Sequence, residues 1–268
     1  MALMHVNFFS DVLGMCVNMD VILPQQTRGQ IGMEGKGAEG RLKTMYLLHG
    51  MSDDQTIWQR RTSIERYVSK LGVAVVMPTT HLGFYTDTTY GMKYWTFISE
   101  ELPGICREFF PQMSDKKEDT LAAGLSMGGY GAWKLGLGAS ETFGYAASLS
   151  GALDVVGTYK RHLKANPQRM DLMKGIFGSA AKLKGSENDL FAAAQKLVAE
   201  GKELPRLYAW CGTEDFLYKD NLRAWKLMKE LGYDLTCEKS SGDHQWQYWD
   251  AKIQDVLRWW LGTDIDLK

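Results

Sequence analysis

The feature that most constrains the fold of this chain is a series of short, nearly continuous apolar runs. They cover residues 44–48, 73–77, 120–124, 145–149 and 206–210. Strands that are buried on both faces have such sequences, because neither face of the strand meets water. Segments with the apolar spacing of a helix separate the runs, so strands and helices alternate through most of the chain. We therefore expect a mostly parallel, doubly wound α/β sheet with helices on both faces.

The ends of the chain extend this sheet. Residues 17–21 alternate apolar and polar side chains, which indicates a strand with one wet face near a sheet edge. Phe8 and Phe9 indicate its antiparallel partner at the N-terminal edge, and residues 235–238 are the expected last strand. Residues 27–40 contain five glycines and no periodicity, so they predict an exposed loop. The expected helices cover residues 57–70, 94–110, 130–137, 222–231 and 246–261.

One segment, residues 154–203, is longer than a crossover between parallel strands needs. It is rich in lysine, alanine and glycine, and it contains turn signals at Asn166-Pro167 and Lys184-Gly185-Ser186. We expect a small helical insertion, similar to a cap, over the carboxyl ends of the strands. The remaining alternation continues without a break, so a single domain over residues 1–268 is expected.

The charge balance excludes several classes of partner. The chain holds 31 lysines and arginines against 32 aspartates and glutamates, so no broad basic surface for nucleic acid or anionic lipid is expected. The N-terminus lacks the basic start and the apolar run of a signal peptide or membrane span. The four widely spaced cysteines, Cys16, Cys106, Cys211 and Cys237, favour free thiols in a reducing compartment. We expect a cytoplasmic protein, and the composition leaves a homo-oligomer open.

The segment Gly124-Leu125-Ser126-Met127-Gly128 has the pattern Gly-x-Ser-x-Gly. Alone the pattern is weak evidence, because it arises by chance in glycine-rich chains. Here it follows a predicted buried strand and precedes a predicted helix, which is the context of a nucleophilic serine on a sharp strand-to-helix turn. Such a turn needs glycines where a Cβ atom would collide with the neighbouring backbone. The sequence therefore predicts Ser126 as a nucleophile.

A serine hydroxyl needs a base that takes its proton, and a histidine is the expected base. Folds with this nucleophile turn place the partners in the chain order serine, acid, histidine. Two histidines follow Ser126, namely His162 and His244. His162 lies among charged residues of a predicted surface helix, whereas His244 lies in a loop at the carboxyl end of the last predicted strand. Catalytic groups gather at such ends, so His244 is the predicted base.

The acid is expected in the loop after the strand at 206–210. Two adjacent carboxylates, Glu214 and Asp215, compete there, and Asp220 follows them. A carboxylate at this place fixes the tautomer of the imidazole and stabilises the imidazolium. Spacing alone does not decide between the candidates, because loops and helix caps often carry carboxylates.

The first buried run ends in a glycine turn at His49-Gly50-Met51. The backbone N–H of Met51 could therefore point into the site beside that of Met127. Two such donors at the developing oxyanion would complete the machinery for acyl transfer. We interpret His49 as a structural residue that braces this loop.

Taken in order, these blocks resemble the esterase D and tributyrin-esterase-like family of α/β hydrolases, which is related to bacterial feruloyl and acetylxylan esterases. The resemblance rests on residues 47–52, 94–97, 101–103, 124–132, 211–215 and 242–246, which span nearly the whole chain. It implies an α/β-hydrolase fold and a serine ester hydrolase. It also implies Ser126, Asp215 and His244 as the catalytic triad, with the main-chain amides of Met51 and Met127 as the oxyanion hole.

The sequence departs from one branch of this family. Formylglutathione hydrolases in the group usually carry a cysteine in the loop after the first buried strand, where this chain reads Met51-Ser52-Asp53-Asp54-Gln55. A thioesterase acting on S-formylglutathione is therefore the less favoured alternative. An acyltransferase to a sugar hydroxyl uses the same acyl-enzyme and stays open. A silent binding module is disfavoured by the complete triad, and no ligand cluster suggests a metal or organic cofactor.

Bulky side chains are expected near the serine, at or beyond the carboxyl ends of the strands. The aromatic residues there are Trp58, Phe84, Tyr85, Tyr90, Trp95, Phe216, Tyr218 and Trp246, of which Trp58, Trp95, Phe216 and Trp246 are predicted to line the substrate pocket. Any one of them can equally be core packing. A crowded pocket predicts short acyl esters, acetyl to butyryl, as substrates, and aromatic walls would accept acetylated or hydroxycinnamoylated sugars.

Overall fold

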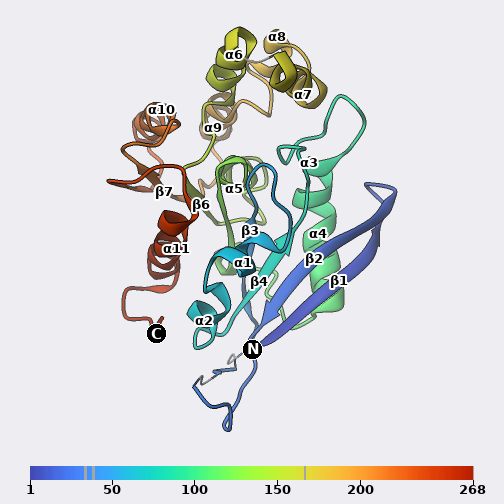
Figure 1. The fold of residues 1–268 in the computed structure, drawn as a ribbon, viewed down its shortest axis with the longest axis vertical. Coiled ribbons are helices and arrows are strands. Elements are labelled where there is room, and N and C mark those ends of the chain that lie inside the picture. The colour runs from blue at the N-terminus through green and yellow to red at the C-terminus, as the bar shows by residue number, and fades with distance from the viewer. Residues whose placement is uncertain (33–34, 38–39, 166, 268) are drawn as a thin grey trace.

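The computed structural model describes residues 1–32, 35–37, 40–165 and 167–267, and for residues 162–165 and 167–168 it describes the backbone alone. Its strands are β1 (Ala2–Ser10), β2 (Met15–Leu23), β3 (Lys43–Leu48), β4 (Val73–Pro78), β5 (Thr120–Leu125), β6 (Tyr145–Leu149), β7 (Arg206–Gly212) and β8 (Leu235–Ser240). They form one sheet in the order β1-β2-β4-β3-β5-β6-β7-β8 (Figure 1). β1 and β2 are antiparallel, and the other six strands run parallel. The predicted parallel sheet with antiparallel N-terminal edge strands is confirmed.

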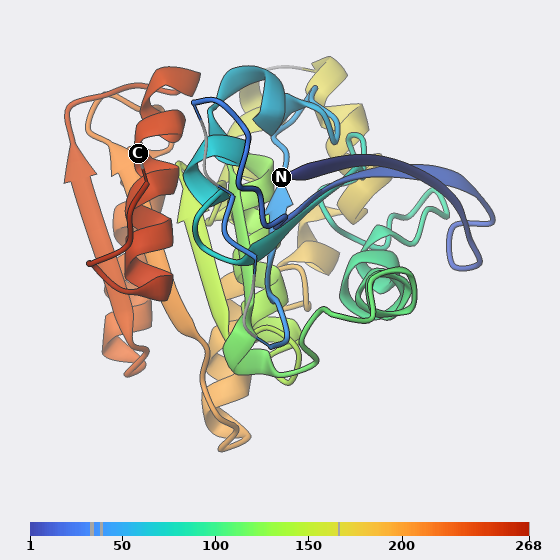
Figure 2. The same ribbon diagram turned by 90° about the horizontal axis from the view of Figure 1, so that it is seen from below.

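Helices cover both faces of this sheet (Figure 2). They are α1 (Ile57–Arg61), α2 (Ile64–Val68), α3 (Tyr94–Thr96), α4 (Leu102–Phe109), α5 (Met127–Gly138), α6 (Val155–Ala165), α7 (Pro167–Phe177), α8 (Ala180–Leu183), α9 (Leu190–Ala199), α10 (Tyr218–Glu230) and α11 (Trp246–Leu261). Successive side chains of a strand point to opposite faces. Met45 and Leu47 of β3 therefore enter the core under α1, α2 and α11, whereas Tyr46 and Leu48 enter the core under α4, α5, α9 and α10.

Two predicted helices are interrupted. The helix expected over residues 57–70 breaks at Thr62, whose backbone is extended and whose hydroxyl bonds back to the Trp58 carbonyl at 2.6 Å. Asp250 of α11 then accepts the Ser63 amide at 3.1 Å and starts α2. The helix expected over residues 94–110 contains a π-helical turn, η1 (Phe97–Glu101), between α3 and α4. A tertiary contact that competes for a backbone donor explains the first break, and sequence periodicity does not report such contacts.

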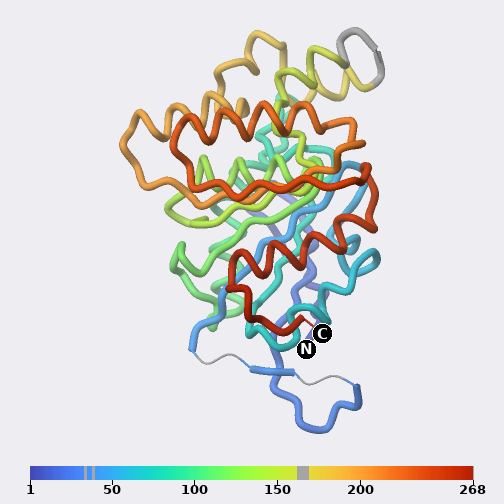
Figure 3. The backbone as a smooth tube through the Cα atoms, turned by 90° about the vertical axis from the view of Figure 1, so that its left-hand side faces the viewer, coloured from blue at the N-terminus to red at the C-terminus, as the bar shows by residue number. Residues whose placement is uncertain are grey.

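The predicted insertion at residues 154–203 contains α6 to α9. α6, α7 and α8 lie at the end of the molecule opposite the two termini (Figures 1 and 3). Phe177 of α7 packs on Phe84, in the loop after β4, at 5.5 Å between ring centroids. In the same region Thr89 donates its hydroxyl hydrogen to the Gly175 carbonyl at 2.6 Å. The insertion thus packs against the segment that leaves the carboxyl end of β4.

Two further sequence predictions concern segments outside the sheet. The loop predicted at residues 27–40 lies partly outside the described residues, and its described part contains neither helix nor strand. Among the helices that the structure describes, none combines the length and the apolar content of a bilayer span.

The common direction of the parallel strands brings several candidate site residues to one edge of the sheet. Because β3, β5, β7 and β8 run in one direction, the segments that follow them emerge at the same edge of the sheet. These segments carry His49 to Met51, Ser126, Asp215 and His244.

Candidate active site

Ser126 occupies a strained turn between β5 and α5. Its φ of 52° and ψ of −116° lie outside the regions that ordinary side chains adopt, and such strain persists only where the surroundings fix it. A Cβ atom at Gly124 would lie 2.5 Å from the backbone of Gly128, and one at Gly128 would lie 2.4 Å from the Leu48 carbonyl oxygen. The two glycines of the sequence pattern therefore make this close approach of three backbone segments sterically possible.

Ser126, His244 and Asp215 form a continuous hydrogen-bonded chain. His244 Nε2 lies 3.0 Å from Ser126 Oγ, and His244 Nδ1 lies 2.8 Å from Asp215 Oδ2. Burial raises the pKa of Asp215, but hydrogen bonds and charge from His244, with hydrogen bonds from the Leu217 amide and Ser150, hold that pKa below its ordinary value. An ionised Asp215 places the imidazole proton on Nδ1, so Nε2 is left to accept the hydroxyl hydrogen of Ser126.

The other acid candidates have different partners. Glu214 Oε2 accepts the Gly242 amide at 2.6 Å, so this carboxylate fastens the loop that carries His244. Asp220 is buried and paired with Arg161 of α6 and Arg223 of α10. Asp215 thus contacts His244, whereas Glu214 fastens a loop and Asp220 connects two helices. The side chain of His162 lies outside the described residues.

Two aromatic rings contact the His244 imidazole. Trp249 of α11 packs edge-on at 4.8 Å between ring centroids, and its indole N–H donates to Ser150 Oγ at 3.2 Å. Phe216 lies at 4.6 Å and is 72% exposed. Ser150 and Trp249 were not predicted from the sequence as site residues. The position of Ser150, directly after β6 at the carboxyl edge, was the available signal.

The loop His49 to Met51, called here the oxyanion loop after the role predicted for the Met51 amide, lies against the turn that carries Ser126. A Cβ atom at Gly50 would lie 2.6 Å from the Leu125 side chain, directly before Ser126. Burial lowers the pKa of His49 to about 4, so the ring is neutral. Its Nδ1 lies 2.7 Å from the Gly50 carbonyl oxygen, and its Nε2 accepts the Thr80 amide at 3.0 Å. Both ring nitrogens of His49 are therefore occupied in holding the loop.

Two backbone amides of this region, those of Met51 and Met127, are unpaired within the part of the chain that the structure describes. Among the described residues, neither the Met51 N–H nor the Met127 N–H donates a hydrogen bond to the chain. Met127 is the first residue of α5, whose amino end carries partial positive charge. Unpaired N–H donors are the groups that an oxyanion hole would require.

The four residues predicted to line the substrate pocket lie in different places. Phe216 contacts His244, as described above. Trp246 is half-buried and packs edge-on between Trp58 and Trp249, at 5.2 Å from each. Trp58 is buried in the core, and its indole N–H donates to the Leu48 carbonyl at 3.0 Å. A row of three tryptophans thus connects the core with His244.

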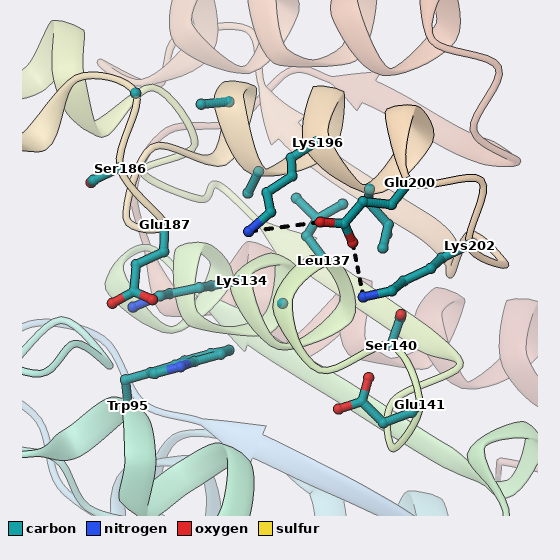
Figure 4. Close-up of a pocket in the computed structure, with 15 residues that line it drawn as sticks. Trp95, Lys134, Leu137, Ser140, Glu141, Ser186, Glu187, Lys196, Glu200 and Lys202 are labelled. Carbon is teal, nitrogen blue, oxygen red and sulfur yellow. Dashed lines mark ion pairs between the residues drawn. The ribbon is translucent and has the colours of Figure 1, made fainter.

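Trp95 lies beside a different cavity. This cavity of about 340 Å³ is formed by the last turns of α5, by α9 and by the segment before it (Figure 4). Trp95 contacts Gly138, the last residue of α5, and the helix rise puts that residue about 18 Å from Ser126. The cavity is therefore separate from the hydrogen-bonded chain around the serine.

Comparison with known proteins identifies relatives of the whole chain. The model of the Esterase family, described as "Putative esterase", matches residues 10–260. An acetyl esterase of Caldicellulosiruptor saccharolyticus is 32% identical over 97% of this chain and 98% of the relative. Among solved structures, the fluorophosphonate-binding serine hydrolase FphF of Staphylococcus aureus has 34% identity and a TM-score of 0.85, covering 97% of this chain and 98% of its own. The S-formylglutathione hydrolase FrmB of the same organism has 34% identity and a TM-score of 0.82, with 97% and 99% covered.

Proposed function

Because the chain belongs to this Esterase family and is an ester hydrolase of the α/β-hydrolase type, we propose that it cleaves short-chain acyl esters through an acyl-enzyme on Ser126. The observation that carries the proposal is the hydrogen-bonded chain from Ser126 through His244 to Asp215. It supplies a nucleophile, a base and a group that orients the base.

The chemistry follows from the positions of these atoms. Ser126 Oγ attacks the ester carbonyl carbon while its proton passes to His244 Nε2. Asp215 stabilises the imidazolium that forms. The imidazolium then protonates the alkoxy oxygen as the carbon–oxygen bond breaks, the alcohol leaves and the acyl group stays on Ser126. A water molecule, deprotonated by His244, attacks the acyl-enzyme and releases the carboxylic acid with Ser126 restored.

We assign the oxyanion hole to the main-chain amides of Met51 and Met127. Support comes from the unpaired N–H groups of both residues and from the position of Met127 at the amino end of α5. The carbonyl oxygen gains charge only as the tetrahedral intermediate forms. Donors fixed in advance therefore favour the transition state over the substrate.

The acyl part of the substrate is proposed to be short, acetyl to butyryl. The acetyl esterase relative supports this choice, and so do the two aromatic rings that contact His244. The exposed Phe216 ring offers a flat apolar surface, on which a hydroxycinnamoyl ester of a sugar could stack. The roles of Trp58, Trp95 and Trp246 in binding stay predictions.

Location, assembly and the insertion belong to the same proposal. We place the enzyme in the cytoplasm, because all four cysteines are free thiols. The helices of residues 154–203 are proposed to be a cap within a single domain, since they pack on the loop that follows β4. Homo-oligomer formation remains compatible with these features.

A second function, hydrolysis of S-formylglutathione, is favoured by the likeness to FrmB. The sequence Met51-Ser52-Asp53-Asp54-Gln55 counts against this function. The formylglutathione hydrolases that the sequence resembles usually carry a cysteine in the corresponding loop. The test measures kcat/KM for acetyl, butyryl, octanoyl and feruloyl esters and for S-formylglutathione, each with and without a sugar acceptor. We expect acetyl or butyryl esters to give the highest value and free acid as the product. A higher value for S-formylglutathione, or acylated sugar as the main product, would select one of the alternatives.

A further inference from the structure

Lys134 of α5 is a buried lysine. It is 2% exposed, and no carboxylate among the described residues forms an ion pair with its ammonium group. A buried charge is costly unless hydrogen bonds and nearby charges compensate it. Burial lowers the pKa of Lys134 to about 7, with smaller opposing effects from Glu187 and Asp87. An apolar residue would fill the same space at lower cost, so the ammonium group needs an explanation.

All three hydrogens of the ammonium group have acceptors on other segments. Nζ donates to the Tyr85 carbonyl at 3.1 Å, to Thr86 Oγ1 at 3.2 Å and to Asn188 Oδ1 at 2.6 Å. The Trp95 ring covers the ammonium group at 4.4 Å (Figure 4). One side chain of the nucleophile helix α5 therefore binds two segments that are far from it in the sequence.

The first of these segments reaches the oxyanion loop. Tyr85 has a φ of 50°, an unfavourable conformation for a bulky residue that its surroundings must hold. Its main chain is bound by Lys134, and its hydroxyl at the other end donates to the His49 carbonyl at 2.8 Å. His49 in turn bonds to Gly50, the residue before Met51. A continuous set of contacts thus runs from Lys134 to the amide assigned to the oxyanion hole.

The second segment is the insertion. Asn188, between α8 and α9, accepts Lys134 at its side chain and the Tyr130 hydroxyl at its carbonyl, the latter at 2.8 Å. Tyr130 and Lys134 lie four residues apart and so share one face of α5. Two side chains of the nucleophile helix therefore hold a single residue of the insertion.

We propose that Lys134 is a positioning residue, which keeps the oxyanion loop and the insertion in register with the helix that begins at Ser126. It touches no reacting atom and acts through Tyr85 and Asn188. The inference rests on the proposed function, because register matters only if the Met51 amide binds the oxyanion. A shift of an oxyanion donor affects the transition state more than the bound ester, so kcat should change more than KM.

The experiment compares Lys134→Met and Tyr85→Phe with the control Lys196→Met. Lys196 lines the rim of the same cavity, and its exposed side chain pairs with Glu200 (Figure 4). Labelling with a fluorophosphonate, which reacts with activated serines, first measures the concentration of competent sites, that is, of molecules with a reactive Ser126, in each preparation. Steady-state hydrolysis of p-nitrophenyl acetate then gives kcat for each competent site, so misfolded protein does not contribute.

We expect Lys134→Met and Tyr85→Phe to lower kcat per competent site by about ten- to a hundredfold, with KM changed by less than about threefold. Lys196→Met should leave both constants unchanged. Full kcat per competent site in Lys134→Met overturns the proposal. If Lys134→Met yields no competent sites, Tyr85→Phe tests the proposal in its place, because it keeps Lys134 and removes only the hydroxyl that reaches His49. An unchanged kcat in Tyr85→Phe overturns the proposal too. Failure of the proposed function would look different, because Ser126→Ala would then still hydrolyse the ester.

Discussion

His244 Nδ1 lies 2.8 Å from Asp215 Oδ2, whereas the adjacent carboxylate, Glu214, accepts the Gly242 amide. Two consecutive acids thus hold the same histidine loop in different ways. One orients the imidazole directly, and the other fixes the backbone two residues before it. This difference separates the two candidates experimentally.

Asp215→Asn is expected to lower kcat by about three to four orders of magnitude, because an amide at this position stabilises the wrong tautomer of His244. Glu214→Gln is the matched control, since glutamine still offers an oxygen to the Gly242 amide and should cost about tenfold or less. Steady-state kinetics on p-nitrophenyl acetate measures both. The larger loss in Glu214→Gln would show that the acid is assigned to the wrong residue.

Ser126→Ala should lower turnover by about four to six orders of magnitude, since triad members act as a unit. The strained backbone of Ser126 does not depend on its hydroxyl, and the substitution should leave the circular dichroism spectrum unchanged. Activity and fluorophosphonate labelling are measured on the same sample. More than a tenth of the wild-type activity in a correctly folded variant contradicts the assignment.

That Ser126 and His244 come together could be predicted from the sequence, for a different reason at each residue. The glycines around Ser126 leave a steric pattern in the sequence, and His244 was selected by chain order and by its place after the last strand. Spacing alone left Asp215 and Glu214 unresolved, and the family resemblance selected Asp215. Adjacent residues of a turn point in different directions, so only the folded loop shows which one is buried. The strands were predictable because burial on both faces leaves continuous apolar runs.

Lys134 and Trp95 illustrate what the sequence could not show. A lysine in a helix normally lies on the wet face, and three acceptors from residues 85, 86 and 188 become visible only in the fold. Trp95 was expected near the serine from its place after a strand. Sixteen residues, 79–94, lie between the end of β4 and Trp95, so the position of the strand end does not fix the position of the ring. After a long connection, the position of a residue in the sequence therefore no longer indicates its position in space.

Met51→Ala tests the assigned oxyanion hole. A backbone N–H does not depend on the side chain attached to it, so kcat should stay within about threefold of the wild-type value, and only substrate fit should change. The measurement is kcat and KM for acetyl and butyryl esters. A collapse of kcat in a folded Met51→Ala protein would contradict a purely main-chain role.

The lowered pKa of Lys134 also predicts that the free energy of unfolding depends on pH. Its pKa is about 7 in the folded protein, below the ordinary value of 10.5, so between these values the unfolded chain binds the proton more tightly. The destabilisation by the buried charge is complete below pH 7 and is relieved as the pH rises towards 10.5. The free energy of unfolding of the wild type minus that of Lys134→Met should therefore increase over this window. Urea titrations at several pH values measure it, and a difference as flat as that for Lys196→Met would refute the prediction.

Substrate size follows from the surroundings of His244. Trp249 and Phe216 lie on the ring at 4.8 and 4.6 Å between centroids, and Trp246 packs behind Trp249. If His244 is the base, bulky side chains beside it would leave little room for a long acyl chain. Phe216 is the exposed member of this group, so its removal should widen the site without disturbing the core.

Along a series of p-nitrophenyl esters from acetate to octanoate, kcat/KM should be highest between two and four carbons. Each methylene that fits should raise it by about tenfold or less, and the first that does not fit should reverse the trend. Phe216→Ala should move the optimum to longer chains. Phe109→Ala, which removes an exposed phenylalanine of α4 outside the site, should leave the optimum in place. An optimum at eight carbons in the wild type would mean an open acyl channel, and the crowded pocket inferred from these rings would then be wrong.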